Sequence, residues 1–314
     1  MTTYKSSLAS SPTLGETTRV LKDEAVRGTN NASIIERRSV KAALPNDATL
    51  LFRFKDDRLP VAVFLALFAA DLSIFAFVSS WPIVVLWSLA MLLPKTLICA
   101  WNHHHQHVPF FSSTICNRLI EVVFGLQTGA CSNVWVLHHN IGHHENYMDQ
   151  TKDESAWRAP DGRIMSSLEY SLKLAATGYL CAYKNSKDRP HLRRTLVLMT
   201  VLHLAILTTL LSINFFSGFF VFVIPMVFSF FMTCRHTYDH HAGCSEEDEY
   251  AASNNIMHRW YNILTGNLGY HTAHHLRPGL HWSKLPAFHS KIADRIPKEN
   301  FRGPGLPMSI LPER

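Results

Sequence analysis

Charged residues are scarce in this sequence, and the stretches that lack them are long. Asp, Glu, Lys and Arg make up 17% of the 314 residues, whereas a soluble domain usually carries about a quarter. Asp71 is the only charged residue between Arg58 and Lys95, and none lies between Arg194 and Arg235. This distribution excludes an ordinary water-soluble globule.

Cysteine pairs and a leader segment are missing as well. The six cysteines are scattered without any Cys-x-x-Cys pair, which argues against a disulfide scaffold. A hydrophobic content of 47% excludes a disordered or collagen-like chain. The first 58 residues lack the apolar core of a cleavable signal peptide. We therefore expect residues 1–57 to be a retained polar extension and residues 58–314 to be a membrane domain.

The basic charge does not form a nucleic-acid-binding stripe. The formal net charge is +6 and the sequence pI is about 9.0, but Lys and Arg crowd the ends of the apolar stretches. Orientation in a membrane explains this pattern better. We expect no nucleic-acid partner.

The second uncharged stretch is too long for one membrane-spanning helix. At about 1.5 Å per residue it would be nearly twice the roughly 30 Å thickness of a bilayer core, so each stretch must fold back as a hairpin. The expected fold is an all-α membrane protein with four transmembrane helices in two hairpins and a cytoplasmic helical cap. The expected spans are residues 59–78, 82–101, 195–214 and 215–233.

The charges flanking the spans predict their orientation. The turns within the hairpins are uncharged, whereas residues 37–58 and 184–194 are rich in Lys and Arg. By the positive-inside rule, both termini and the long middle loop face the cytoplasm. Two further apolar stretches, residues 116–137 and 166–184, contain charges and are expected to lie in the membrane interface.

Three polar residues fall within or beside the predicted spans. Asp71 and His203 lie inside them, and an Asp at that depth costs about 2.5 to 3.5 kcal/mol on insertion scales. A packing hydrogen bond between helices is the favoured interpretation for both, ahead of a role in a substrate tunnel or proton path. Lys95 is expected to extend its amine to the cytoplasmic interface.

Most of the 19 histidines lie in four short clusters, at residues 103–107, 138–144, 236–241 and 271–275. Within each cluster histidines recur three or four residues apart, which places them on one face of a helix. All four clusters are predicted on the cytoplasmic side. Neutral imidazole binds Zn, Cu, Fe and Ni, and eight or nine such ligands exceed the needs of one ion. The spacing predicts a two-metal centre.

A single H-x-x-x-H pattern is often only a polar helix edge, but four such clusters on one side favour metal binding. His104, His105 and His138 are weaker candidates because each adjoins a better-spaced histidine. The H-E-x-x-H motif of zinc hydrolases is absent. Iron that handles dioxygen is the favoured metal, with zinc, manganese and copper left open.

The histidine clusters, their order and their position after two hairpins resemble the membrane-bound fatty acid desaturase and hydroxylase superfamily, which includes the alkane hydroxylases. The string N-L-G-Y-H-T-A-H-H at 267–275, followed by Pro278 and Trp282, is similar to the most specific signature of that family. The likeness covers roughly residues 58–290.

The resemblance implies a ligand set for two iron ions. It assigns the ligands as His103, His107, His139, His143, His144, His271, His274 and His275, with His240 as the further histidine after the last span. His236 stands where relatives often have asparagine, so it would bind metal directly or through water. Asn267 would orient a metal-bound water. Asp239 and Glu145 are candidate carboxylates behind the ligands.

The resemblance further implies an oxidase that reduces dioxygen with external electrons. Desaturation of a fatty acyl chain is favoured, with hydroxylation and oxidative decarboxylation to terminal alkenes as alternatives. Expected partners are dioxygen, membrane lipid and a fatty acyl substrate as free acid, thioester or lipid. No haem domain, ferredoxin cysteine run or dinucleotide motif is present, so a separate ferredoxin, rubredoxin or cytochrome with its reductase is expected to supply electrons.

A membrane metal-binding or transport protein is the alternative from another functional class. Transporters bind their ions near the middle of the bilayer, where only His203 is predicted. The clusters outside the spans therefore favour the enzyme.

Overall fold

The computed structural model describes residues 51–305 and 308–312. In this part of the chain all regular structure is helical, and only isolated β-bridges accompany the helices. The predicted all-α class is confirmed. Residues 1–50, which form most of the predicted polar extension, lie outside the described residues.

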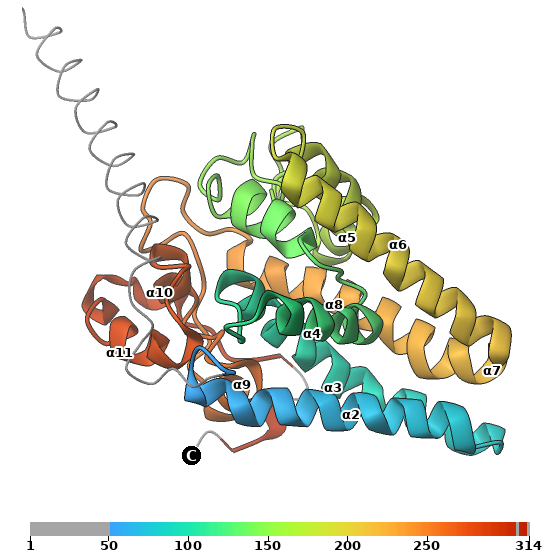
Figure 1. Ribbon diagram of the computed structural model, residues 1–314. Coiled ribbons are helices and arrows are strands. Elements are labelled where there is room, and N and C mark those ends of the chain that lie inside the picture. The colour runs from blue at the N-terminus through green and yellow to red at the C-terminus, as the bar shows by residue number, and fades with distance from the viewer. Residues whose placement is uncertain (1–50, 306–307, 313–314) are drawn as a thin grey trace, which may run out of the picture. The chain divides into compact units, whose positions relative to one another are not determined.

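Four helical segments are long and apolar enough to cross a membrane. The first hairpin pairs α2 (Arg58–Phe77) with α3 (Trp81–His107). The second pairs α6 (Pro190–Ile213) with a segment that comprises α7 (Phe215–Gly218), the π-helix η3 (Phe219–Val223) and α8 (Ile224–His241). Figure 1 shows these long helices extending in the same direction away from a cap of short helices. The four predicted membrane helices are present.

Two of the helices continue beyond the predicted spans. The helix α3 runs on to His107, and α8 runs on to His241. No glycine or proline interrupts either extension, so in each case the apolar span and the histidine cluster form one continuous helix. The first and third clusters are consequently fixed to the rigid ends of membrane helices.

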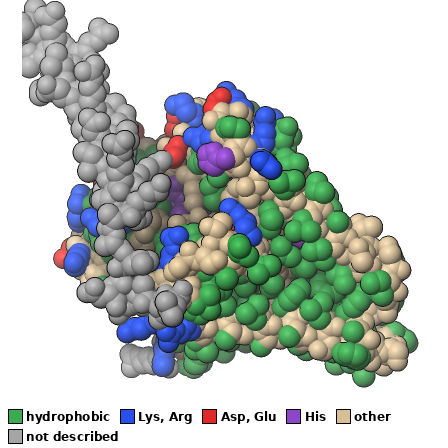
Figure 2. All heavy atoms as spheres, in the orientation of Figure 1, with side chains coloured by type: hydrophobic (Ala, Val, Ile, Leu, Met, Phe, Trp, Pro, Cys, Tyr) green, Lys and Arg blue, Asp and Glu red, His purple; other side chains and the backbone are tan. Residues whose placement is uncertain are grey.

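The outer surface of the long helices is apolar. Figure 2 shows hydrophobic side chains spread over this part of the molecule, with Lys and Arg gathered toward the cap. Large hydrophobic side chains are exposed on every long helix, including Leu59, Phe77, Leu86, Leu198, Ile213 and Phe215. Such a continuous apolar surface suits lipid rather than water.

Shorter helices cover the ends of the spans. The helix α4 (Thr114–Thr128) packs against α3 and α8, and α5 (Ser167–Asn185) packs against α8 and η2 (Val136–His143). The C-terminal part adds α9 (Arg259–Thr265), α10 (His271–Leu276) and α11 (Leu285–His289). The helix α5 exposes Leu168 and Leu172, as expected of a helix in the membrane interface.

The start of α2 is tied to the C-terminal cap. Asp57 is fully buried and accepts hydrogen bonds from Trp282 Nε1 at 2.8 Å and from His281 Nε2 at 3.0 Å. Phe54 stacks on the His281 ring with 3.9 Å between centroids. A buried carboxylate needs such partners, so this contact fastens the last part of the described chain to the first hairpin.

Asp71 does form the expected contact between helices, but Lys95 does not reach the interface. Lys95 is 1% exposed, and its amine lies 2.9 Å from the Asp71 carboxylate and 2.8 Å from the Val221 carbonyl. Trp87 Nε1 donates to Asp71 at 3.0 Å. The Lys95 amine therefore links α2, α3 and η3, and it gives the buried Asp71 carboxylate the partner that a buried charge needs.

We expect Lys95→Met to lower the free energy of unfolding by about 3 to 5 kcal/mol, because it leaves the Asp71 carboxylate buried without its cation. Denaturant titration of the protein in detergent measures this change. The double variant Asp71→Leu with Lys95→Met removes both charges and should cost less than Lys95→Met alone. A double variant less stable than the single variant would contradict this account.

Candidate metal centre

The histidine clusters converge into two groups in the cap. The first group contains His103, His107, His139, His144 and His274, and the second contains His143, His241 and His275. Within each group the candidate ligand atoms all lie within 4.8 Å of one another. The groups are adjacent, since the His144 and His275 rings stack with 4.2 Å between centroids.

In the first group the Nε2 atoms face one another. His103 Nε2 lies 2.8 Å from His139 Nε2 and 3.2 Å from His107 Nε2. His144 Nε2 lies 3.0 Å from both His139 Nε2 and His274 Nε2. Histidines of α3, η2 and α10 thus meet at one point, although they are up to 171 residues apart in the chain (103 to 274).

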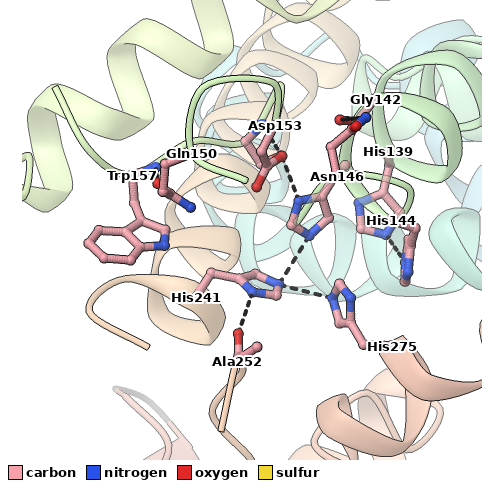
Figure 3. A network of polar contacts seen from close by, with 12 residues as sticks. His139, Gly142, His144, Asn146, Gln150, Asp153, Trp157, His241, Ala252 and His275 are labelled. Carbon is pink, nitrogen blue, oxygen red and sulfur yellow. Dashed lines mark hydrogen bonds and ion pairs between the residues drawn. The ribbon is translucent and has the colours of Figure 1, made fainter. Parts of the chain in front are cut away.

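His241 Nε2 is the hub of the second group. It lies 3.2 Å from His143 Nε2, 3.0 Å from His275 Nε2 and 3.0 Å from His271 Nε2. In Figure 3, dashed lines join His241 to His275 and to the Ala252 carbonyl. His271 therefore adjoins the second group through His241.

The hydrogen bonds around the second group show which nitrogen of each ring carries the hydrogen. His143 Nδ1 lies 2.8 Å from the Asp153 carboxylate, and His241 Nδ1 lies 3.3 Å from the Ala252 carbonyl. Both oxygens are acceptors, so each Nδ1 carries a hydrogen, and in the neutral form of a ring Nε2 then presents a lone pair. Two lone pairs facing each other repel unless a cation lies between them.

The spacing of the nitrogens fits such a cation. Metal–imidazole bonds are about 2.0 to 2.1 Å long, so two neighbouring ligands of one ion lie about 3 Å apart. Neighbouring Nε2 atoms within the groups are separated by 2.8 to 3.2 Å. The residues present therefore fit two metal ions with nitrogen-rich ligand sets.

Burial keeps these rings in the form that binds metal. The pKa values of five ring nitrogens outside the membrane helices lie well below the usual histidine value, first because the rings are buried and then because neighbouring rings would repel one another's charge. These residues are His139, His144, His271, His274 and His275. At neutral pH they are uncharged and offer their lone pairs.

A π-helix divides the second cluster between the two groups. In η2 the His144 N–H donates to the His139 carbonyl five residues earlier. Residues five apart therefore share a face, which brings His139 and His144 into the first group and turns His143 to the second. The prediction assumed α-helical spacing, which would have paired His139 with His143. π-Helical turns are rare and occur frequently at functional sites.

Seven of the nine predicted ligands belong to the two groups, and His271 contacts one of them. His240 lies outside both. Its Nδ1 donates to the Asn254 carbonyl at 3.1 Å, and its Nε2 accepts from the Tyr261 hydroxyl at 3.0 Å. With both nitrogens occupied, His240 stacks on His271 at 3.9 Å between centroids and supports that ring. Its neighbour His241, which the sequence analysis did not include, occupies the second group.

The remaining candidates also lie outside the groups. His236 lines a cavity beside the centre. Asn267 has a left-handed backbone and donates its amide hydrogen to the Trp282 carbonyl at 3.2 Å, so it orders the loop before α10. Asp239 pairs with Arg235 on the same helix.

Asp153 was missing from the predicted set. It is buried, receives the His143 Nδ1–H and accepts a further hydrogen bond from the Ser155 N–H at 2.7 Å. A carboxylate behind a ligating histidine fixes the ring and raises its basicity. Asp153 lies in an irregular loop. No histidine follows His144 in this loop, so no local sequence pattern indicated that Asp153 belongs to the site.

A cavity of about 510 Å³ reaches both groups. It begins between apolar side chains of α3 and α8 and extends to His103 and His139 of the first group and to His241 and His271 at the second. Along α3, from Leu89 to His103, it spans about 21 Å at 1.5 Å per residue. A long apolar molecule that entered this cavity would pass beside both candidate metal sites.

The profile of the fatty acid desaturase family matches residues 79–302, which contain all the histidines of both groups. The chain therefore belongs to the fatty acid desaturase family, and membership implies a membrane enzyme of the desaturase or hydroxylase type. Diiron centres are known in this family, in keeping with the two histidine groups. No curated protein matches the chain.

The adjacent histidines on α8 provide a matched pair of variants. We expect His241→Ala to lose metal, because it removes the hub of the second group, whereas His240→Ala should retain most of the metal, because it removes only a ring that stacks on His271. Metal analysis of the detergent-purified variants distinguishes them. Loss of metal in His240→Ala with retention in His241→Ala would refute the assignment made from the geometry.

Asp153→Ala should weaken metal binding about 10- to 100-fold, because His143 loses the carboxylate that orients it. The matched control is Asp149→Ala in the same loop, since Asp149 pairs with the exposed Lys152. Competition with a chromogenic chelator measures both affinities. Equal affinities in the two variants would show that Asp153 does not support the site.

Proposed function

We propose that this chain is a membrane diiron oxidase that desaturates a fatty acyl chain. The observation that carries the proposal is the cavity, which joins an apolar space between α3 and α8 to histidines of both groups. A volume of about 510 Å³ is in the range of small-molecule sites. An acyl chain is the natural occupant of an apolar channel inside a membrane protein.

The histidine sets would hold two iron ions, which with dioxygen and two external electrons supply an oxidant for unactivated C–H bonds. The chain's own residues position the substrate and exclude water. Leu92, Leu93 and Phe228 provide apolar walls that keep water away from the acyl chain. His143 is oriented by Asp153, and His271 by the stacked His240 ring.

The reaction balances as the removal of two hydrogens from neighbouring carbons. A –CH2–CH2– unit, dioxygen, two electrons and two protons give –CH=CH– and two waters. The electrons come from a separate donor such as a ferredoxin, a rubredoxin or a cytochrome with its reductase. Hydroxylation and oxidative decarboxylation begin with loss of the same kind of hydrogen and differ in the product.

The centre is further proposed to face the cytoplasm. Basic residues lie at the start of both hairpins: Arg58 begins α2, and the basic residues 184–194 lie before and at the start of α6. The histidines that end α3 and α8 lie at this same end of the hairpins. Positive charge at one end of the spans favours the cytoplasmic side.

The test is product analysis. Membranes that contain the chain are supplied with long-chain acyl substrates, dioxygen and a reductase system, and the lipids and headspace gas are analysed. We expect an internal double bond, which is absent with His274→Ala because that variant lacks a ligand of the first group. A hydroxyl product would show a hydroxylase instead, and a volatile alkene would show an oxidative decarboxylase. If the iron-loaded chain gives no oxidised product at all, the oxidase is rejected.

A further inference from the structure

The cavity between α3 and α8 carries charge as well as apolar surface. Three charged side chains line it, namely Arg235, Asp239 and Arg302. Arg235 and Asp239 lie on α8, and Arg302 lies on the segment that follows α11, which also lines the cavity with Gly303, Pro304 and Gly305. A purely hydrocarbon substrate would gain nothing from this polar part of the wall.

Two of the three charges cancel. Arg235 and Asp239 lie one helical turn apart on α8, and Arg235 Nη1 donates to the Asp239 carboxylate. The Arg235 guanidinium also lies over the Tyr238 ring, 5.9 Å from its centroid. This pair is satisfied within α8 and adds no net charge to the cavity.

Arg302 is the charge that remains. Its backbone N–H donates to the Asn255 carbonyl at 2.8 Å, and Phe301 forms an isolated bridge with the same residue. The backbone is therefore held in place while the side chain is exposed. Among the ion pairs of residues 51–305 and 308–312 none involves Arg302, so the cavity wall bears one uncompensated positive charge.

We propose that Arg302 binds the carboxylate of a free fatty acid whose chain occupies the apolar part of the cavity. This inference rests on the proposed function, because it takes the occupant to be an acyl chain. One positive charge matches one carboxylate, and the planar guanidinium forms paired hydrogen bonds with its two oxygens. An ester or thioester presents an uncharged carbonyl and leaves Arg302 to water.

Binding affinity tests the inference without turnover. The metal-loaded protein in lipid nanodiscs is titrated with palmitic acid, methyl palmitate and palmitoyl thioester. We expect the wild-type protein to bind the free acid about tenfold more tightly than the ester, since hydrogen bonds to charged groups are the stronger ones. Arg302→Gln should bind the acid and the ester equally.

Two control variants separate charge from structure. Arg302→Lys keeps the charge without the paired geometry and should retain part of the preference. The double variant Arg235→Gln with Asp239→Asn removes the neutral pair, leaves the net charge unchanged and should retain the full preference. Circular dichroism and metal content show that each variant is folded and loaded.

The outcomes separate this inference from the proposed function. Equal binding of acid and ester by the wild-type protein, tighter binding of the thioester, or an unchanged preference in Arg302→Gln would overturn the carboxylate site. Oxidation of both acid and ester at equal rates would also overturn it, while the oxidase would stand. A preference for the acid that disappears in Arg302→Gln supports the carboxylate site, whether or not an acyl chain is oxidised. A failure to oxidise any acyl chain would reject the oxidase and leave the carboxylate site standing.

Discussion

The candidate metal centre depends on imidazole nitrogens that face one another in a buried site. His143 and His241 each direct an Nδ1 hydrogen to an oxygen acceptor, so their Nε2 lone pairs face each other 3.2 Å apart. A metal ion between the two rings would bind both nitrogens and remove that repulsion. The helix ends, the π-helical turn and the loop that carries Asp153 position these rings.

The sequence predicted the membrane hairpins and most of the candidate ligands because both depend on composition and short spacing. Long uncharged stretches allow few alternatives, and the resemblance supplied eight histidines that the structure brings to the centre. Two points were not predictable from spacing. His240 is kept out of the groups by its hydrogen bonds to Tyr261 and Asn254, which leaves His241 in the second group. The π-helix places His139 and His144 in the first group and His143 in the second.

Long-range partners account for the other differences. Lys95 pairs with Asp71 from another helix, and Asp153 reaches His143 through an irregular loop. Neither contact has a local signature in the sequence. The same two helices link the centre and the cavity, because α3 and α8 each carry apolar residues of the cavity and end in histidines of the centre. Shifting either helix would move the channel and the ligands together.

The metal content of the wild-type chain tests the central claim most directly. Protein purified from iron-supplied cells is measured by elemental analysis, and the metal environment by X-ray absorption at the metal edge. The account predicts about two iron atoms per chain, each surrounded mainly by nitrogen at about 2.0 to 2.2 Å. A chain that is folded yet binds one metal ion or none would contradict it.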